Sequence, residues 1–181
     1  FHFGGAGKYS RLALEADCVG FAVSAHRFHP HPESSVLTAT GASPMSFAIP
    51  AGTQPPIVMD GGNWVDHNEP LEQAFARGPA TFFKILGLGA VCHALGGFMA
   101  GIWLFDKPPG PGIWEGANQG AFILAIDIAR FMPIENFKKE VDRHISEIHQ
   151  MKPAPGYDRA NLPGALEWER EREWAKIGIP I

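Results

Sequence analysis

A glycine-rich turn stands just ahead of the first segment with helical spacing. Residues 1–7 read Phe-His-Phe-Gly-Gly-Ala-Gly, and a helix is predicted over about residues 8–17, with Tyr9, Leu12 and Ala16 on one face. Such a turn favours phosphate binding, because free backbone N–H groups and the helix dipole attract an anion. A cradle of this kind normally follows a β-strand, so we expect either a processed chain or part of a larger protein.

Three histidines close together raise the question of a metal site. His26, His29 and His31 lie within six residues, and imidazole suits zinc or copper. However, Pro30 and Pro32 alternate with them, no cysteine is near, and no H-x-x-x-H helix is present. The pattern therefore favours a solvated loop, and we predict no metal.

The elements that must position these residues alternate between strand and helix patterns. Apolar strand patterns cover residues 19–25, 44–51, 55–60 and 120–127, and we expect them to be buried. Helical patterns cover residues 71–77, 85–105, 134–151 and about 163–178. Asp60 ends a strand and precedes two glycines, and ligands gather beyond the carboxyl ends of strands in open α/β sheets. The alternation predicts an α/β fold.

Composition narrows the class of protein. A chain of 181 residues with 45% hydrophobic and 19% charged residues is typical of one globular domain, here residues 1–181. The net charge of −4 argues against a nucleic-acid partner. Cys18 and Cys92 form no metal or disulfide pattern, which favours a reducing, cytoplasmic location.

The apolar segment at residues 85–105 has two interpretations. His93 is its only strongly polar side chain, and its length could span a bilayer. Gly97 and Gly101 also fit the small-xxx-small pattern of packed membrane helices. Alternatively, the segment is a helix buried on all sides in a soluble core, with glycines that allow close packing. Length alone does not decide between them.

The order of several short motifs carries more information than any one of them. Along the chain these are HFGGAGKYSRLALEA, VGFAVSA, GASPMSFAIPA, PPIVMD, KILGLGAVCHALGGFMAG, NQGAFILAID and a late LPG. Together they resemble the malate/L-lactate dehydrogenase family, the non-Rossmann group that includes ureidoglycolate and sulfolactate dehydrogenases. The resemblance implies an α/β fold with a mixed sheet and packed helices, lacking the N-terminal region. It also implies that the apolar helix is buried in a soluble protein, with no membrane.

The resemblance implies an NAD(P)-dependent oxidoreductase that interconverts a small 2-hydroxy acid and its 2-oxo acid. His2 matches the histidine of the HFG motif, which exchanges a proton with the substrate oxygen in the family. Imidazole suits this step because it titrates near neutral pH. The competing interpretation of His2 is a terminal histidine that merely packs.

Positions that match the cofactor contacts of the family follow along the chain. They are Asp60, Gly61, Gly62, Lys84, Asn118, Gln119 and Gly120. By the resemblance they would hold NAD or NADP. Each also has a simpler interpretation, because Asp60 can cap a turn, Lys84 can be solvated, and the last three can shape a turn.

The resemblance also implies further polypeptide. In the family, an N-terminal region supplies the Ser, His and Arg side chains that bind substrate. We therefore expect a companion chain or N-terminal fragment, and a homo- or hetero-oligomer.

Several departures from the family pattern support a second hypothesis. Ala42 and Ser43 replace two polar cofactor contacts, Trp64 stands where a small hydroxyl residue is usual, and His93 replaces an acidic residue. Each lost hydrogen bond costs about 1 kcal/mol, and each 1.4 kcal/mol is about tenfold in affinity. The alternative is a non-catalytic or repurposed subunit that no longer binds the cofactor and completes a partner chain. A hydrolase or lyase built around His2 lacks a nucleophile motif.

Overall fold

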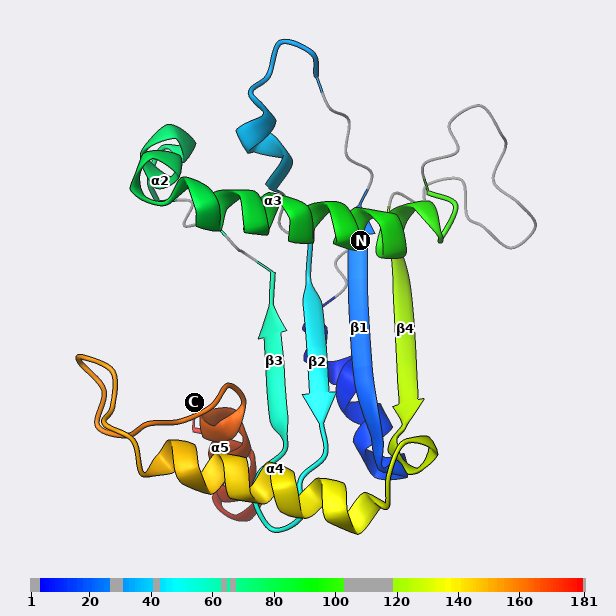
Figure 1. Cartoon of the computed structure of the whole chain (residues 1–181), viewed down its shortest axis with the longest axis vertical. Coiled ribbons are helices and arrows are strands. Elements are labelled where there is room, and N and C mark those ends of the chain that lie inside the picture. Colours follow the sequence, from blue (N-terminus) through cyan, green and yellow to red (C-terminus); the bar gives the residue numbers. More distant parts are fainter. Residues whose placement is uncertain are drawn as a thin grey trace. The chain divides into compact units, whose positions relative to one another are not determined.

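The computed structural model of the chain describes residues 4–26, 31–40, 43–62, 65, 68–102 and 119–180. Within these residues, four strands form one open sheet in the order β3-β2-β1-β4. They are β1 (Cys18–His26), β2 (Met45–Ile49), β3 (Ile57–Gly61) and β4 (Gln119–Asp127). Neighbouring strands run antiparallel (Figure 1), whereas we expected mixed directions. The α/β class and the strand positions are confirmed.

The chain divides into two compact units. Unit 1 comprises Phe1–Ala6, Ala22–Met45 and Gly61–Ile123, and unit 2 comprises Gly7–Phe21, Ser46–Asp60 and Leu124–Ile181. The single domain over residues 1–181 stays a prediction.

Burial of the strands differs from the expectation at β3, which has no fully buried residue, and at β4. β1 is buried along most of its length, and β2 exposes chiefly Phe47. β4 was expected to be buried, but Ile123, Leu124 and Ile126 are exposed. β3 and β4 are the two edge strands of the described sheet, and apolar composition does not tell which strands lie at an edge.

The opening segment of unit 2 forms two short helical turns in place of one amphipathic helix. They are α1 (Gly7–Ser10) and the 3₁₀ turn η1 (Arg11–Ala16). The apolar face predicted for this segment is largely exposed, since Leu12 is 63% exposed. Contact with the sheet runs through Ser10 instead, because a Cβ on Gly20 of β1 would lie only 1.8 Å from the Ser10 carbonyl oxygen.

Unit 1 contains the long apolar helix together with two shorter helical elements. The 3₁₀ turn η2 (Val36–Thr40) and α2 (Leu71–Arg77) come before it in the chain, and α2 matches the predicted range. The long helix is α3 (Pro79–His93), which continues into a π-helical turn, η3 (Ala94–Phe98). It begins earlier than predicted, because Pro79 at its first position is compatible with a helix start.

Close packing through glycine is confirmed at the end of this helix. A Cβ on Gly96 would lie 2.7 Å from the backbone nitrogen of Ala25 in β1. Burial on all sides is not found. Pro79–Phe98 is long and apolar enough to cross a membrane, and 33% of its most apolar window is buried. Length and composition of a single helix are weak evidence for a membrane span.

In the last part of unit 2, α4 and α5 match their predicted positions, whereas the short 3₁₀ turn η4 was not predicted. The three elements are η4 (Ile128–Arg130), α4 (Ile134–His149) and α5 (Ala165–Ile177). α5 ends at Gly178, whose φ of 88° suits glycine. The LPG motif lies against β3, where the backbone N–H of Val58 donates to the Pro163 carbonyl at 3.2 Å.

Candidate functional site

Four strand ends meet in unit 1, and the residues there include three that were singled out from the sequence, Ser43, Gly62 and Gly120. The Ser24 hydroxyl, near the end of β1, donates to the Gly120 carbonyl at the start of β4 at 2.7 Å. The Ser24 N–H donates to the Pro44 carbonyl, just before β2, at 3.0 Å. A Cβ on Gly62, just after β3, would lie 3.4 Å from the Pro44 Cα. We call Ser24, Ser43, Pro44, Gly62 and Gly120 the strand-end cluster.

Ser43 is the polar side chain of this cluster that has no protein partner within the described residues. Its hydroxyl is buried, with the residue only 1% exposed, and makes no hydrogen bond there. Buried hydroxyl groups are nearly always hydrogen-bonded, so an unpaired one marks a position where a ligand, water or further polypeptide belongs.

Two histidines lie near the same end of β1. The rings of His26 and His93 meet edge to face, with centroids 6.3 Å apart. Burial lowers the pKa of His93, and the nearby His26 lowers it further, because a second positive charge is unfavourable there. His93 therefore stays neutral at pH 7. Among the described residues, no group of three or more metal-binding side chains forms.

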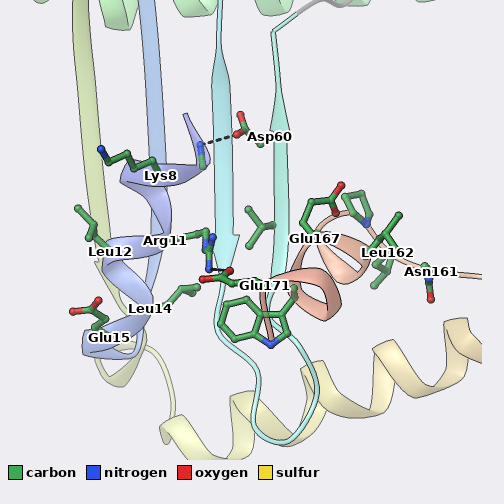
Figure 2. A pocket seen from close by; sticks show the side chains of 16 residues that line it. Lys8, Arg11, Leu12, Leu14, Glu15, Asp60, Asn161, Leu162, Glu167 and Glu171 are labelled. Atoms are coloured by element: carbon green, nitrogen blue, oxygen red, sulfur yellow. Dashed lines mark hydrogen bonds and ion pairs between the residues drawn. The ribbon is translucent and has the colours of Figure 1, made fainter. Parts of the chain in front are cut away.

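In unit 2 the opening glycine turn meets Asp60. The backbone N–H of Gly7 donates to Asp60 Oδ2 at 2.9 Å, and a Cβ on Gly7 would lie 2.8 Å from the same oxygen (Figure 2). The Asp60 carboxylate therefore accepts the hydrogen bond from the N–H group that we expected to bind phosphate. With α1 only four residues long, the helix dipole there is also small. The cradle at Gly7 thus holds an internal anion.

A cavity of about 860 Å³ lies in unit 2 and includes this contact. α1 and η1 form one wall and α5 another, with Lys8, Arg11 and Glu15 on the first and Glu167 and Glu171 on the second (Figure 2). Arg11 Nη2 bonds Glu171 Oε2 at 2.6 Å across it. The size suits a small molecule, but the described lining holds no histidine or cysteine for acid–base or nucleophilic chemistry near neutral pH.

Only some of the remaining predicted site residues lie at the strand-end cluster. Gln119 and Gly120 lie at the strand-end cluster, whereas Lys84 is exposed on α3. His2 and Asn118 lie outside the described residues, as do Ala42 and Trp64.

Sequence reasoning missed the contacts of α5. The Arg11 guanidinium lies 5.1 Å from the Trp168 ring centroid, and Arg172 lies 5.5 Å from it. The alternating Glu and Arg residues of the last helix indicate that charged side chains there form pairs. They do not indicate that Arg11 of η1 is one of the partners.

Known proteins similar to this chain indicate its family. The family model for malate/L-lactate dehydrogenase matches residues 61–181, about two-thirds of the chain. The chain belongs to the malate/L-lactate dehydrogenase family. It is 24% identical to a malate dehydrogenase of Pyrococcus horikoshii over 99% of this chain and 59% of that protein. It is 26% identical to an L-sulfolactate dehydrogenase of Methanocaldococcus jannaschii, over 99% of this chain and 60% of that protein.

Solved structures give the same fold. The malate dehydrogenase structure from Pyrococcus horikoshii OT3 superposes with a TM-score of 0.75 at 22% identity, covering 99% of this chain and 58% of that one. The sulfolactate dehydrogenase structure from Methanocaldococcus jannaschii has a TM-score of 0.63 at 23% identity, covering 60% of that chain. The chain thus spans about three-fifths of these relatives and corresponds to their C-terminal portion.

The described residues fit a nicotinamide cofactor in part. The unpaired Ser43 hydroxyl and the half-buried Gly62 give the strand-end cluster a free polar group and a close approach to backbone. At Gly120 a side chain would not fit, because a Cβ there would lie 2.4 Å from both the Gly96 carbonyl oxygen and the Ala100 Cβ.

Proposed function

We propose that this chain is the C-terminal portion of an NAD(P)-dependent oxidoreductase that interconverts a small 2-hydroxy acid and its 2-oxo acid. The observation that carries the proposal is the strand-end cluster. Segments as far apart in sequence as Ser24, Pro44, Gly62 and Gly120 meet there. Membership in a family of malate, lactate and sulfolactate dehydrogenases gives the reaction class.

The residue roles follow from chemistry. The bound cofactor would accept or donate the hydride. Asp60, Gly61 and Gly62, with Gln119 and Asn118, would position the cofactor, and Lys84 would attract its phosphates as an exposed cation. His2 would exchange the proton, because hydride transfer leaves charge on the substrate oxygen. Gly120 would support the site through its packing against Gly96.

The proposal includes partners and location. The chain spans about 59% of the length of its relatives, which supports a proposal that the substrate-binding side chains come from further polypeptide. We therefore propose a companion segment, meaning the polypeptide that carries the rest of the family fold, within a homo- or hetero-oligomer. The cytoplasm suits a dehydrogenase with this cysteine usage.

Cofactor titration tests the proposal. The protein, purified as the assembly formed in its own cells, is titrated with NADH and NADPH while tryptophan fluorescence is recorded. We expect saturation at roughly micromolar concentration, and about tenfold weaker binding for Lys84→Ala, since one charged contact is worth about 1.4 kcal/mol or more. Lys139→Ala on α4 is the matched control and should change nothing. Absence of any response up to about 1 mM, a binding free energy weaker than about −4 kcal/mol, contradicts the proposal.

A specific observation favours the alternative of a non-catalytic subunit. The Asp60 carboxylate accepts a hydrogen bond from the Gly7 N–H, and the Gly120 carbonyl accepts one from the Ser24 hydroxyl, so groups at two expected cofactor positions are already bonded within the protein. On this alternative the assembly forms normally, yet neither nucleotide binds. The same titration, read together with the intact mass of the assembly, separates the two functions.

A further inference from the structure

The last helix of unit 2 buries little of its surface. The structure describes every residue of α5, and only Ala165, at its first position, is buried, while Trp168 and Trp174 are half-buried. All other residues of α5 are exposed. In α4, by comparison, buried and half-buried residues recur at helical steps over Ile134–Ile148. A helix with few buried contacts opens locally at a low cost in free energy, so α5 depends on a small number of contacts.

The N-terminal end of α5 is fixed to β3 through the backbone. The Val58 N–H donates to the Pro163 carbonyl at 3.2 Å, just before the helix begins. Gly164 follows with a φ of 90°, and a Cβ there would lie 2.9 Å from the Val58 carbonyl oxygen. Only glycine adopts this conformation easily and allows such a close approach. This end of the helix is therefore a fixed point.

Further along α5, one side chain of η1 makes the contact. Arg11 Nη2 donates to Glu171 Oε2 at 2.6 Å, and the Arg11 guanidinium lies 5.1 Å from the Trp168 ring centroid. Trp168 and Glu171 are three residues apart on one face of the helix, so one planar cation binds both. Among the described residues, no other hydrogen bond, ion pair or cation–π contact joins α5 to η1. Glu169 pairs instead with Arg159, ten residues earlier in the chain.

We infer that α5 is a hinged lid on the cavity of unit 2, with Gly164 as the hinge and Arg11 as the side chain that holds it closed. α5 forms one wall of this cavity and η1 stands opposite, so the Arg11–Glu171 pair crosses it (Figure 2). When the pair breaks, α5 turns away from η1 and opens the cavity, which Val58 of β3 also lines. The inference concerns unit 2 alone and does not depend on cofactor binding.

The lid contact is sensitive to salt. The side chains of Arg11 and Glu171 are 37% and 57% exposed, so dissolved ions screen their attraction. Raising NaCl from about 50 mM to about 500 mM shortens the Debye length from about 14 Å to about 4 Å. Opening of α5 should therefore increase with salt, whereas helices held by packing should respond little.

Hydrogen exchange followed by mass spectrometry tests the inference. The protein, purified as the assembly formed in its own cells, is compared at the two salt concentrations, and exchange is followed in the peptides that cover α5, α4 and β1. We expect α5 to exchange faster than α4, and its exchange rate to rise roughly threefold at high salt, because the closing contact is an exposed ion pair.

Variants identify the residue that closes the lid. Arg11→Ala should speed the exchange of α5 about tenfold, because an exposed ion pair and a cation–π contact are lost together, and should abolish the salt effect. Glu171→Gln removes one charge at constant size and should give a smaller increase in the same direction. Arg143→Ala is the matched control, because its ion pairs with Glu140 and Glu147 lie within α4, and it should leave α5 unchanged.

Several outcomes would overturn the inference. These are exchange of α5 that is no faster than that of α4, that does not change with salt, or that is the same in the wild type, Arg11→Ala and Glu171→Gln. Faster exchange of β1 together with α5 would also overturn it, because the loss would then be general and not confined to the lid. The measurement uses no nucleotide, so its result and that of the cofactor titration are independent.

Discussion

The two long helices of the chain, α3 in unit 1 and α4 in unit 2, are held in different ways. α3 packs through backbone contact, with Gly96 against Ala25 of β1. α4 is held through hydrogen bonds, because Asp142 accepts from the backbone N–H groups of Gly52, Thr53 and Gln54 and from the Thr53 hydroxyl at 2.7–3.1 Å. Its outer face carries ion pairs of Arg143 with Glu140 and Glu147.

The difference shows in what each helix leaves to solvent. α4 exposes charges, which water solvates well, so its outer face is complete as it stands. α3 exposes Phe83, Val91 and Phe98, whose exposure to water is unfavourable by roughly 1.5–3 kcal/mol for each large side chain relative to full burial. The first helix therefore keeps an apolar outer surface, whereas the second anchors the loop between β2 and β3.

The largest expected effect tests the steric contact of α3. Gly96→Ala forces a Cβ to 2.7 Å from the Ala25 nitrogen, and we expect the free energy of unfolding to fall by about 3 kcal/mol. Gly87→Ala on the same helix meets nothing within 4 Å and should raise stability by up to about 1 kcal/mol through helix propensity. Urea denaturation of both variants measures the difference. Equal changes would show that the contact at Gly96 is not close.

Thiol reactivity tests the buried face of the same helix. Burial raises the pKa of Cys92 to about 11 from 9.0, so its thiolate population at pH 8 is about 100-fold below that of an ordinary thiol. Cys18 is half-buried. Iodoacetamide labelling followed by mass spectrometry should modify Cys18 first, and Cys18→Ser should remove the fast phase. Labelling of both thiols at one rate would contradict the burial of Cys92.

Removal of the anchor on α4 comes next. Asp142→Ala takes away the acceptor for three backbone N–H groups and one hydroxyl, and we expect a loss of about 1–2 kcal/mol, because these groups then turn to water. Glu147→Ala, which removes a surface ion pair, should cost less than about 0.5 kcal/mol. Denaturation curves that show equal losses would assign no special role to Asp142.

The same anchor has a pH dependence. Burial raises the pKa of Asp142, but the donors from Thr53, Gln54 and Gly52 outweigh it and leave the pKa below 3.8. The stability from this carboxylate is therefore present above pH 3.8 and is lost as the pH falls through the lowered value. The stability difference between wild type and Asp142→Ala should shrink in that acidic range.

The smallest effect concerns His93 on α3. Its pKa lies below 6.5, so the unfolded chain takes up a proton first as the pH falls, and stability declines below pH 6.5. One proton gives a slope of at most about 1.4 kcal/mol per pH unit. His93→Gln should remove this decline, whereas His144→Gln on α4 should not. A decline that persists in His93→Gln would assign the protonation to another group.

Local patterns predicted most of the elements. The strand at residues 19–25 appears as β1, and the helix at residues 71–77 appears as α2, because strand and turn residues act over a few neighbours. The first helix was predicted less well, since Ser10 turns inward to bond Ser46 at 2.7 Å and Leu12 is left exposed. The inward direction of Ser10 depends on Ser46 of β2, which lies 36 residues further along the chain.

The amino-acid sequence by itself determined the order of helices and strands, the family, and the positions where cofactor contacts are proposed. Periodicity, turn residues and ordered motifs are all local, so they are readable without coordinates. Only the tertiary structure decided that Gly96 is packed and Gly87 is open, that β4 is an edge, and that Gly7 bonds Asp60. Two glycines of one helix are alike in sequence, and only the atoms that other segments bring beside each one make them different.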